Sequence, residues 1–263
     1  MPKFFVTQKQ INENNIKIIG QDVRHIKNVL RKAVGDEIII CDNTDEKDYL
    51  CRIDAIEKEI INCKIIKKLE EHNESNIQVT IFQGLPKFDK MELIIQKSVE
   101  LGVYDIVPTE MKRCVVKLQE KDKEKKTQRW NKIAEVAAKQ CGRSRIPKIQ
   151  PIIKLKEIKD LIKKYDIFLI AYENEQDTSL RQILEKLKIE NKNENLKVGI
   201  LIGPEGGIAN EEIESLKDYG ALTISLGKRI LRTETVALNV LSIIMYELEN
   251  QEEDKWKQYQ RIY

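Results

Sequence analysis

The strongest constraint on the fold is a regular alternation of apolar runs and amphipathic segments that begins at Ile77. Short runs rich in Ile, Val and Leu predict strands at 77–83, 104–107, 149–153, 167–172, 197–203 and 222–226. Apolar residues at helical spacing predict helices at 90–101, 128–141, 155–164, 179–189, 211–219 and 235–249. Alternating strands and helices form a mainly parallel sheet with helices on both faces. Such an α/β sheet binds ligands outside the carboxyl ends of its strands.

Several helix ends carry capping signals. Asp89 followed by Glu92 resembles a capping box, and Gly102 lies just past the end of that helix. Asn210 is predicted to cap the helix after the strand at 197–203. The low-complexity segment KLQEKDKEKKTQ (117–128) is expected to be an exposed loop or a frayed helix start.

The first part of the chain has a different pattern. Short β-type runs such as FFV (4–6), EIIIC (37–41) and YLCRIDAI (49–56) recur between turn-forming stretches, with one helical segment around 21–31. Many short strands in about 70 residues are typical of a small barrel. The polar stretch EHNESN (71–76) resembles a linker. We therefore expect two domains, a small β-barrel at 1–72 and a larger α/β domain at 73–263.

Composition excludes several classes of protein. The 263 residues are 41% hydrophobic and 34% charged, enough apolar residues for a core, and no apolar run approaches the roughly 18 residues of a membrane span. No signal peptide is evident at the N-terminus, so we expect a cytosolic, cytoplasmic protein with no membrane partner. Five cysteines without a CxxC pair make a disulfide framework improbable. His25 and His72 have no further ligands at metal-binding spacing, so no metal site is predicted.

The net charge is only +3, but basic residues are segregated. Residues 1–35 hold seven basic side chains against two acidic ones, and residues 112–148 hold thirteen against four. A surface that contacts phosphates requires such clustering. The alternative is a lysine-rich solvated face, and charge alone does not separate the two.

Two strand-to-helix loops are candidates for a binding site. In ILIGPEGGIANEEI (200–213) an apolar strand runs into Gly203–Gly207, where missing Cβ atoms would let backbone approach a ligand. The motif is neither a GxGxxG fingerprint nor a P-loop, and the alternative is a tight turn. In ISLGKRILRTETVALNVLSIIMYELE (224–249), a basic loop precedes Thr233-Glu234-Thr235 and an apolar helix. The alternative is a capped final helix, with Thr233 or Thr235 as the cap.

A third candidate lies at 134–147, where Gln140, Arg143 and Arg145 gather at a helix end and could hold phosphate. The alternative is a basic helix C-terminus that interacts with the helix dipole.

Together these motifs resemble one family. GPEGG (203–207) followed by LGKRILRTET (226–235) is similar to the ribosomal RNA small-subunit methyltransferase E family, within the SPOUT (α/β-knot) methyltransferases. The resemblance extends over essentially the whole chain, through segments 25–31, 87–108, 112–117, 129–147 and 171–173. One departure is Val236, where the family more often has alanine.

The resemblance implies a C-terminal trefoil-knotted domain preceded by a PUA-like RNA-binding barrel. It also implies a homodimer that uses S-adenosylmethionine to methylate N3 of a specific uridine in small-subunit (16S) ribosomal RNA, either free or in the assembled subunit. The cofactor would be held by residues of three strand-end loops, namely Ala171, Tyr172, Leu201, Ile202, Gly203, Gly207, Leu226, Gly227, Ile230, Leu231 and Arg232.

Chemical roles follow from the reaction that the resemblance implies. Uracil N3 carries a weakly acidic proton, so the reaction needs a base or a stabiliser of the developing anion. We assign Arg232 as anion stabiliser and Glu205 as a base or a counter-charge to the sulfonium. The target base must be unpaired when it reacts. The predicted RNA contacts are Arg24, Lys27 and Arg31 from the barrel, with Arg113, Arg129, Arg143 and Arg145.

Other functions remain open from the sequence. A related knotted methyltransferase could act on a ribose 2′-hydroxyl or on transfer RNA. A non-catalytic RNA-binding or assembly module is a second alternative, against which the glycine and LGKRILRTET loops argue. A dinucleotide oxidoreductase is more distant because its fingerprint is missing.

Overall fold

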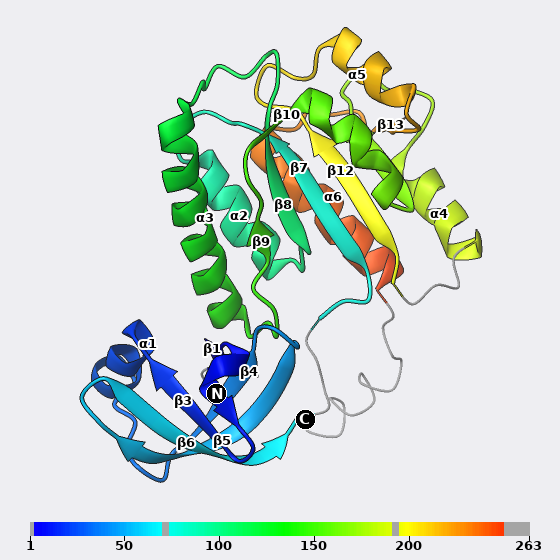
Figure 1. The fold of residues 1–263 in the computed structure, drawn as a ribbon. Helices are drawn as coiled ribbons and strands as arrows, with labels where there is room; N and C mark the ends of the chain where they lie inside the picture. Colours follow the sequence, from blue (N-terminus) through cyan, green and yellow to red (C-terminus); the bar gives the residue numbers. More distant parts are fainter. Residues whose placement is uncertain (1–2, 70–73, 191–194, 250–263) are drawn as a thin grey trace. The chain divides into compact units, whose positions relative to one another are not determined.

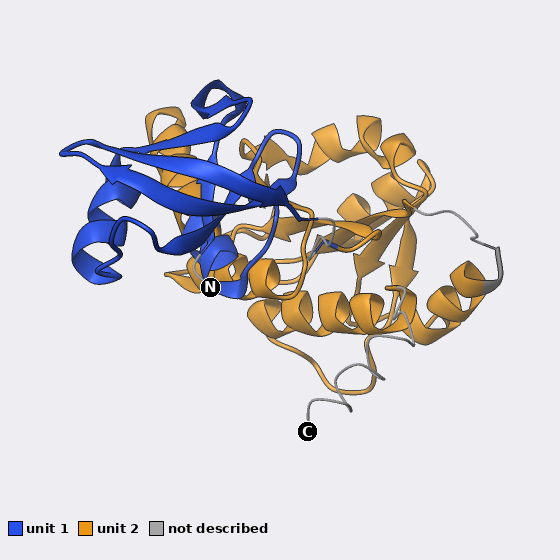
Figure 2. Cartoon of the chain, turned by 90° about the horizontal axis from the view of Figure 1, so that it is seen from below, with its two compact units in different colours: residues 1–74, 135–146 blue, residues 75–134, 147–263 orange. Residues whose placement is uncertain are grey.

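The computed structural model describes residues 3–69, 74–190 and 195–249 of the 263. The chain forms two compact units (Figure 2). Unit 1 comprises residues 1–74 and 135–146, and unit 2 comprises 75–134 and 147–263. The predicted boundary at 72/73 and part of the predicted linker 71–76 fall outside the described residues. The segment 135–146 joins unit 1 although it lies far along the sequence, which the predicted domain division did not include.

Unit 1 contains a six-stranded sheet in the order β1-β4-β5-β6-β3-β2. Its strands are β1 (Lys3–Val6), β2 (Ile11–Asn12), β3 (Asn15–Ile19), β4 (Glu37–Asp42), β5 (Lys47–Ile56) and β6 (Ile60–Lys68). Among the described strands of this sheet, β1 and β4 pair in parallel and the other pairs are antiparallel. The short helices are the 3₁₀ segment η1 (Gln8–Gln10), α1 (Gln21–Arg24) and the π-helical turn η2 (His25–Val29).

Alternation of side chains gives this sheet its buried face. In β3 the two buried residues, Ile16 and Ile18, alternate with exposed neighbours, as a strand with one solvated face requires. They pack with Phe4, Ile26 and Ile40 in one hydrophobic cluster. Register shifts in the β5–β6 pair bend the strands and help the sheet to curl around that cluster.

Unit 2 is built on a seven-stranded sheet in which every pair is parallel (Figure 1). The order is β10-β8-β7-β12-β11-β13, with β9 beside β8. The strands are β7 (Gln78–Gly84), β8 (Asp105–Glu110), β9 (Lys148–Ile149), β10 (Ile153–Lys154), β11 (Ile167–Ala171), β12 (Lys197–Ile202) and β13 (Leu222–Ile224). The central strands β7 and β12 are buried almost throughout, because both faces of the sheet are covered.

Helices flank the sheet. They are α2 (Lys90–Glu100), α3 (Glu120–Cys141), α4 (Leu180–Glu190), α5 (Asn210–Lys217) and α6 (Thr233–Leu248), with 3₁₀ helices η3 (Leu155–Asp160) and η4 (Ile162–Lys164). Figure 1 shows α6 behind β7 and β12, and α2 between α3 and β8; α2 also packs against α6. Helix α2 buries Met91, Ile94, Ile95, Ser98 and Val99, a stripe at helical spacing. None of the helices among the described residues is both long and apolar enough to cross a membrane.

The predicted α/β fold class with a small β unit is confirmed, but several local details differ. The segment 155–164 forms two 3₁₀ helices instead of an α-helix. Most of the segment 117–128 belongs to α3, which begins at Glu120. The trefoil knot stays a prediction.

The predicted caps at Asp89 and Asn210 are wrong in detail. Asp89 stands at the N-cap of α2 but its side chain makes no capping bond, and Glu92 pairs with Arg129 instead. Ala209 caps α5, so Asn210 is already helical, and its Oδ1 accepts a hydrogen bond from the Tyr172 hydroxyl at 3.2 Å. Both helices lie close to where they were predicted, and only the capping interactions at their first residues differ.

Candidate active site

A cavity of about 500 Å³ opens at the carboxyl edge of the sheet in unit 2. Its walls come from the segments that follow β11, β12 and β13, together with Lys90 and the first turns of α6. These three strands are parallel neighbours, so the loops after them meet at one edge. Ten of the predicted cofactor-binding residues line the cavity, namely Ala171, Tyr172, Ile202, Gly203, Gly207, Leu226, Gly227, Ile230, Leu231 and Arg232.

Leu201 is the exception among the predicted cofactor residues. Its side chain is 0% exposed and does not line the cavity. Leu201 lies inside β12, paired with Ile170 of β11, and the turn begins only after Ile202. The assignment of Leu201 to cofactor contact through its side chain is therefore withdrawn.

Close backbone packing explains the glycines of the GPEGG turn. Gly207 has φ +69, in the left-handed region, and its N–H donates to the Pro204 carbonyl at 2.9 Å. At the end of β7, a Cβ on Gly84 would lie 2.8 Å from the backbone nitrogen of Pro204. The turn can thus press against β7 and leave its other side to the cavity.

Thr233 connects three segments of the site. Its hydroxyl donates to the Gly203 carbonyl at 2.7 Å and accepts a hydrogen bond from Gln83 Nε2 at 2.8 Å. The sequence interpretation of Thr233 as a helix cap is wrong, because Arg232 occupies the N-cap and Thr233 is the first helical residue. The hydroxyl is used instead to fix β7, the GPEGG turn and α6 against one another.

Charged side chains gather where α2 begins. Lys90 Nζ lies 3.0 Å from Glu205 Oε1 and 3.2 Å from Glu234 Oε2. The Lys87 N–H also donates to Glu205, at 3.1 Å. Two carboxylates therefore share one ammonium group at the rim of the cavity.

These contacts fix the charge states of the cluster. Partial burial acts to raise the pKa of Glu205, but hydrogen bonds from its own backbone, from Lys90 and from Lys87 outweigh it and hold the pKa below its ordinary value. Hydrogen bonds to Glu205 and Glu234 raise the pKa of Lys90. Glu205 is thus a carboxylate and Lys90 an ammonium at neutral pH.

The basic loop between β13 and α6 faces the same cavity. Lys228, Arg229 and Arg232 line it and are exposed. Arg232 stands at the N-cap of α6. Arg113, predicted to contact RNA, is also exposed, and its Nη1 donates to the Gly206 carbonyl at 3.1 Å. Basic groups therefore approach the turn as well as the cavity.

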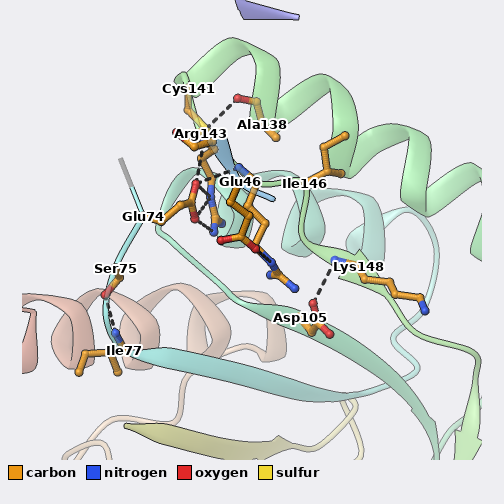
Figure 3. Close-up of polar contacts among 12 residues, drawn as sticks. Glu46, Glu74, Ser75, Ile77, Asp105, Ala138, Cys141, Arg143, Ile146 and Lys148 are labelled. Atoms are coloured by element: carbon orange, nitrogen blue, oxygen red, sulfur yellow. Dashed lines mark hydrogen bonds and ion pairs between the residues drawn. The ribbon is translucent and has the colours of Figure 1, made fainter. Parts of the chain in front are cut away.

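Two of the predicted RNA contacts have a structural role inside unit 1. The Arg143 side chain is 7% exposed and forms an ion pair with Glu74 (Figure 3). The same carboxylate accepts hydrogen bonds from the Ser144 and Arg145 backbone N–H groups, at 2.7 and 3.1 Å. Arg145 Nε lies 3.1 Å from Glu46 Oε1, and the Arg145 side chain is 14% exposed. These placements argue against RNA contact by Arg143 and Arg145, because both side chains are largely buried as well as ion-paired within the protein.

The other predicted RNA contacts are more accessible. Arg24 and Arg31 are exposed in unit 1, Arg24 as the last residue of α1 and Arg31 two residues after η2. Lys27 is half-buried, and its Nζ donates to the Glu57 carbonyl at 3.1 Å. Arg129 belongs to unit 2, where it pairs with Glu92 at 2.8 Å while its side chain stays 66% exposed.

Sequence analysis missed the roles of Lys90, Glu234 and Glu173. Lys90 follows β7, whose carboxyl end reaches the same sheet edge, so the rule that ligands bind there could have found it. Glu234 stands beside Thr233, which was noticed only for capping. Glu173 lines the cavity, and its Oε1 would lie 2.6 Å from a Cβ on Gly207.

The fold and the site define a class: an α/β protein that binds a small ligand with apolar and charged parts at the carboxyl edge of a parallel sheet, joined to a small β unit. Two family models match the chain. One is described as an RNA methyltransferase domain and matches residues 73–245, and the other is described as an RNA methyltransferase PUA domain and matches 18–66.

Individual proteins agree with the family models. The chain is 36% identical to ribosomal RNA small subunit methyltransferase E of Bacillus subtilis, over 95% of this chain and 98% of that one. It is 35% identical to the Mesomycoplasma hyopneumoniae protein of the same name, over 92% and 98%. The crystal structure of ribosomal RNA small subunit methyltransferase E from Neisseria gonorrhoeae, bound to S-adenosyl methionine, matches with TM-score 0.79 and 28% identity, over 94% and 97%. The chain belongs to the ribosomal RNA small subunit methyltransferase E family.

Proposed function

We propose that this protein transfers a methyl group from S-adenosylmethionine to N3 of a specific uridine in small-subunit ribosomal RNA. The observation that carries the proposal is the cavity of about 500 Å³, walled by the GPEGG and LGKRILRTET loops. The family and the S-adenosyl methionine bound to the Neisseria gonorrhoeae relative support the cofactor and the class of reaction. The choice of N3 rests on the family resemblance of those motifs and on the chemistry argued below.

The residues of the cavity fit S-adenosylmethionine. Ile202, Leu226 and Leu231 offer apolar surface for an adenine ring, and backbone groups of the same loops can bind its polar edge. Nothing lies within 4 Å of the position that a Cβ on Gly227 would take, which leaves room for a ligand beside that loop. The carboxylate of Glu205 offers negative charge to a sulfonium.

The bound cofactor supplies a methyl group that is already activated on a positively charged sulfur. The protein must then position the nucleophile and manage the charge that develops on the uracil. Arg232 lines the cavity at the N-cap of α6 and would stabilise a negative uracil. Of the two roles expected for Glu205, its lowered pKa favours the counter-charge, because a carboxylate that holds its charge so firmly is a weak base.

The RNA would be held by basic side chains of both units. Arg24, Lys27 and Arg31 of unit 1 and Arg113 and Arg129 of unit 2 are proposed to contact its backbone. N3 lies on the Watson–Crick edge, so the target uridine must be unpaired to reach the cavity. The PUA domain model matched to residues 18–66 supports RNA contact by unit 1.

The remaining features implied by the family complete the proposal. The protein would be a homodimer whose larger domain contains a trefoil knot, and a ribosomal RNA substrate would place it in the cytoplasm. The substrate would be free small-subunit RNA or the assembled subunit. Sedimentation of the purified chain tests the dimer directly.

The decisive experiment incubates the purified protein with methyl-labelled S-adenosylmethionine and unmodified small ribosomal subunits, then identifies the labelled nucleoside. We expect label in 3-methyluridine. Label in a ribose-methylated nucleoside would keep the cofactor and refute the target atom. No label in subunits, free ribosomal RNA or transfer RNA would refute methyl transfer to RNA and favour a binding module.

A matched pair of variants tests the role of Arg232. Arg232→Ala is expected to lower kcat by roughly 10²- to 10³-fold, as loss of one preorganised anion stabiliser does. Arg181→Ala, on the exposed surface of α4, removes the same charge away from the cavity and should leave kcat unchanged. Wild-type kcat in Arg232→Ala would remove Arg232 from the mechanism.

A further inference from the structure

Phe88 has a conformation and an exposure that the fold itself does not explain. Phe88 is 89% exposed, and its backbone φ is +56. Non-glycine residues rarely adopt the left-handed region, and for a bulky residue such a φ is an outlier. Backbone outliers of this kind cluster at ligand-binding sites.

Folding gains little from this aromatic ring. A side chain as exposed as that of Phe88 removes almost no apolar surface from water, so it contributes little hydrophobic stabilisation. A glycine would adopt φ +56 without steric strain. The phenylalanine therefore serves something other than stability.

The ring of Phe88 lies at the edge of a second cavity, of about 250 Å³. Trp130 of α3 is 4% exposed and forms part of its wall. Lys126 Nζ lies 5.9 Å from the centre of the Trp130 ring. Aromatic and apolar side chains line the cavity together with two basic ones, Lys126 and Arg129, and two acidic ones, Asp89 and Glu92. Arg129 is paired with Glu92 at 2.8 Å but stays 66% exposed. The aromatic and apolar part of the lining is Phe88, Trp130, Val116 and Leu118.

This second cavity adjoins the active site through one short loop. Phe88 and Asp89 line the second cavity, whereas Lys90 lines the first. The N–H of Lys87, just before Phe88, donates to Glu205 at 3.1 Å. A group bound against Phe88 would therefore be a close neighbour of a group bound in the methyl-transfer cavity.

Charge identifies the kind of ligand. The segment 112–132, which supplies the other wall, carries nine basic residues and three acidic ones. The lining itself has as many acidic as basic side chains, so the positive charge comes from this neighbouring segment. Proteins hold single-stranded nucleic acid with an exposed aromatic ring next to a positively charged surface, since bases stack on the ring and phosphates meet the cations. A second copy of this chain that approached with the same surface would bring the same positive charge and would be repelled there.

We propose that Phe88 and the second cavity hold an unpaired nucleobase that neighbours the target uridine in the RNA substrate. The base stacks on the Phe88 ring, and Lys126 and Arg129 contact the adjoining phosphates. This inference rests on the proposed function, because it takes the first cavity as the site of methyl transfer. Binding of one neighbouring base keeps the strand unstacked while the uridine is presented.

The test compares Phe88→Leu, Phe88→Gly and Phe88→Tyr with the wild-type protein on unmodified small ribosomal subunits. Loss of one base–aromatic stack weakens RNA binding by roughly 5- to 100-fold, so the KM for subunits should rise by this factor in Phe88→Leu and Phe88→Gly. Phe88→Tyr keeps the ring and should stay close to wild type. Val115→Ala removes apolar surface from a 67% exposed residue that does not line the cavity, and should change nothing.

Two further measurements keep the outcome decisive. The Kd for S-adenosylmethionine should stay within about twofold of wild type in every variant. Phe88→Gly should have a Tm at least as high as wild type, because glycine adopts the positive φ without strain. An unchanged KM in Phe88→Leu, or an equal loss of cofactor binding, would overturn the inference. A changed sedimentation coefficient in Phe88→Leu would assign the surface to a protein partner and would also overturn it.

Direct binding of the unmodified subunits separates this inference from the proposed function. If the wild-type protein binds subunits without methylating them, the proposed reaction fails, and the Kd of Phe88→Leu for subunits still decides the stacking site. If the wild-type protein does not bind RNA at all, both fail.

Discussion

Thr233→Val offers the sharpest test of how the active site is held together. Thr233 is 5% exposed, and its hydroxyl joins Gln83 of β7 to the Gly203 carbonyl at the start of the GPEGG turn. Valine has nearly the same shape, so the substitution removes two hydrogen bonds with little change in packing. We expect the GPEGG turn to loosen and S-adenosylmethionine to bind more weakly.

The size of the effect follows from these contacts. Each buried hydrogen bond contributes about 1 kcal/mol net, which gives about 2 kcal/mol for the pair. Gln83 Nε2 keeps a second acceptor, the Gly84 carbonyl at 3.0 Å, so its loss is limited. Gly203 is half-buried, so water from the cavity can reach its freed carbonyl. A loss of about 2 kcal/mol corresponds to a fall in Tm of about 4 to 8 °C for a domain of this size.

Thermal unfolding followed by circular dichroism, with and without S-adenosylmethionine, measures both effects. Thr235→Val is the matched control, because Thr235 lies on the same helix and is exposed. Its unfolding free energy should stay within about 0.5 kcal/mol of wild type. If Thr233→Val had the same Tm as Thr235→Val, the Thr233 hydroxyl would have no structural role and the reasoning would be refuted.

Three further predictions concern groups elsewhere in the chain. Glu74→Gln leaves the nearly buried Arg143 without its counter-charge, so unit 1 should lose about 2 to 4 kcal/mol of unfolding free energy in urea denaturation, and no loss would refute the structural role of the pair. Burial raises the pKa of both Cys51 and Cys63 to about 12, so at pH 8 a maleimide should label neither thiol in the native protein but both in urea, as peptide mass spectrometry would show. Because the pKa of Glu205 is lowered in the folded protein, its carboxylate stabilises the fold at any pH above the ordinary carboxyl pKa. This stabilisation is lost as the pH falls through the pKa of Glu205 in the folded protein. The difference in Tm between wild type and Glu205→Gln should accordingly be constant from about pH 6 to 9 and shrink below about pH 4, and a difference that grew on acidification would contradict the sign.

Periodic patterns predicted the framework of unit 2. Most strands and helices lie within a few residues of their expected positions, because burial of apolar residues at fixed spacing selects a strand or a helix locally. The strand expected at 149–153 is instead two short strands, β9 and β10. The predicted helix at 155–164 became two 3₁₀ segments although Leu155, Ile158 and Ile162 have helical spacing and are buried. The spacing of three residues between Leu155 and Ile158 suits both helix types, and the sequence pattern does not separate them.

Motif loops predicted the edge of the sheet at which the cavity lies, for a different reason. Parallel strands bring their carboxyl ends to one edge, so the loops that follow them must meet, whatever the details. The prediction that Leu201 lines the cavity is wrong, because a shift of one position along the chain decides whether a side chain packs within the sheet or faces the loop. Lys90 was missed because its role depends on Glu205 and Glu234, which approach it only in the folded chain.

The basic residues show where sequence reasoning ends. Charge segregation is visible in the sequence, and it predicted exposed cations such as Arg24 and Arg129. Charge segregation could not show that Arg143 forms an ion pair with Glu74, since the two residues are 69 positions apart in the chain. By itself, the sequence determined the alternation of elements, the edge at which a ligand binds and the family. Only the tertiary structure decided which charges face solvent and which pair with each other, because a side chain's partner is set by distances that arise on folding.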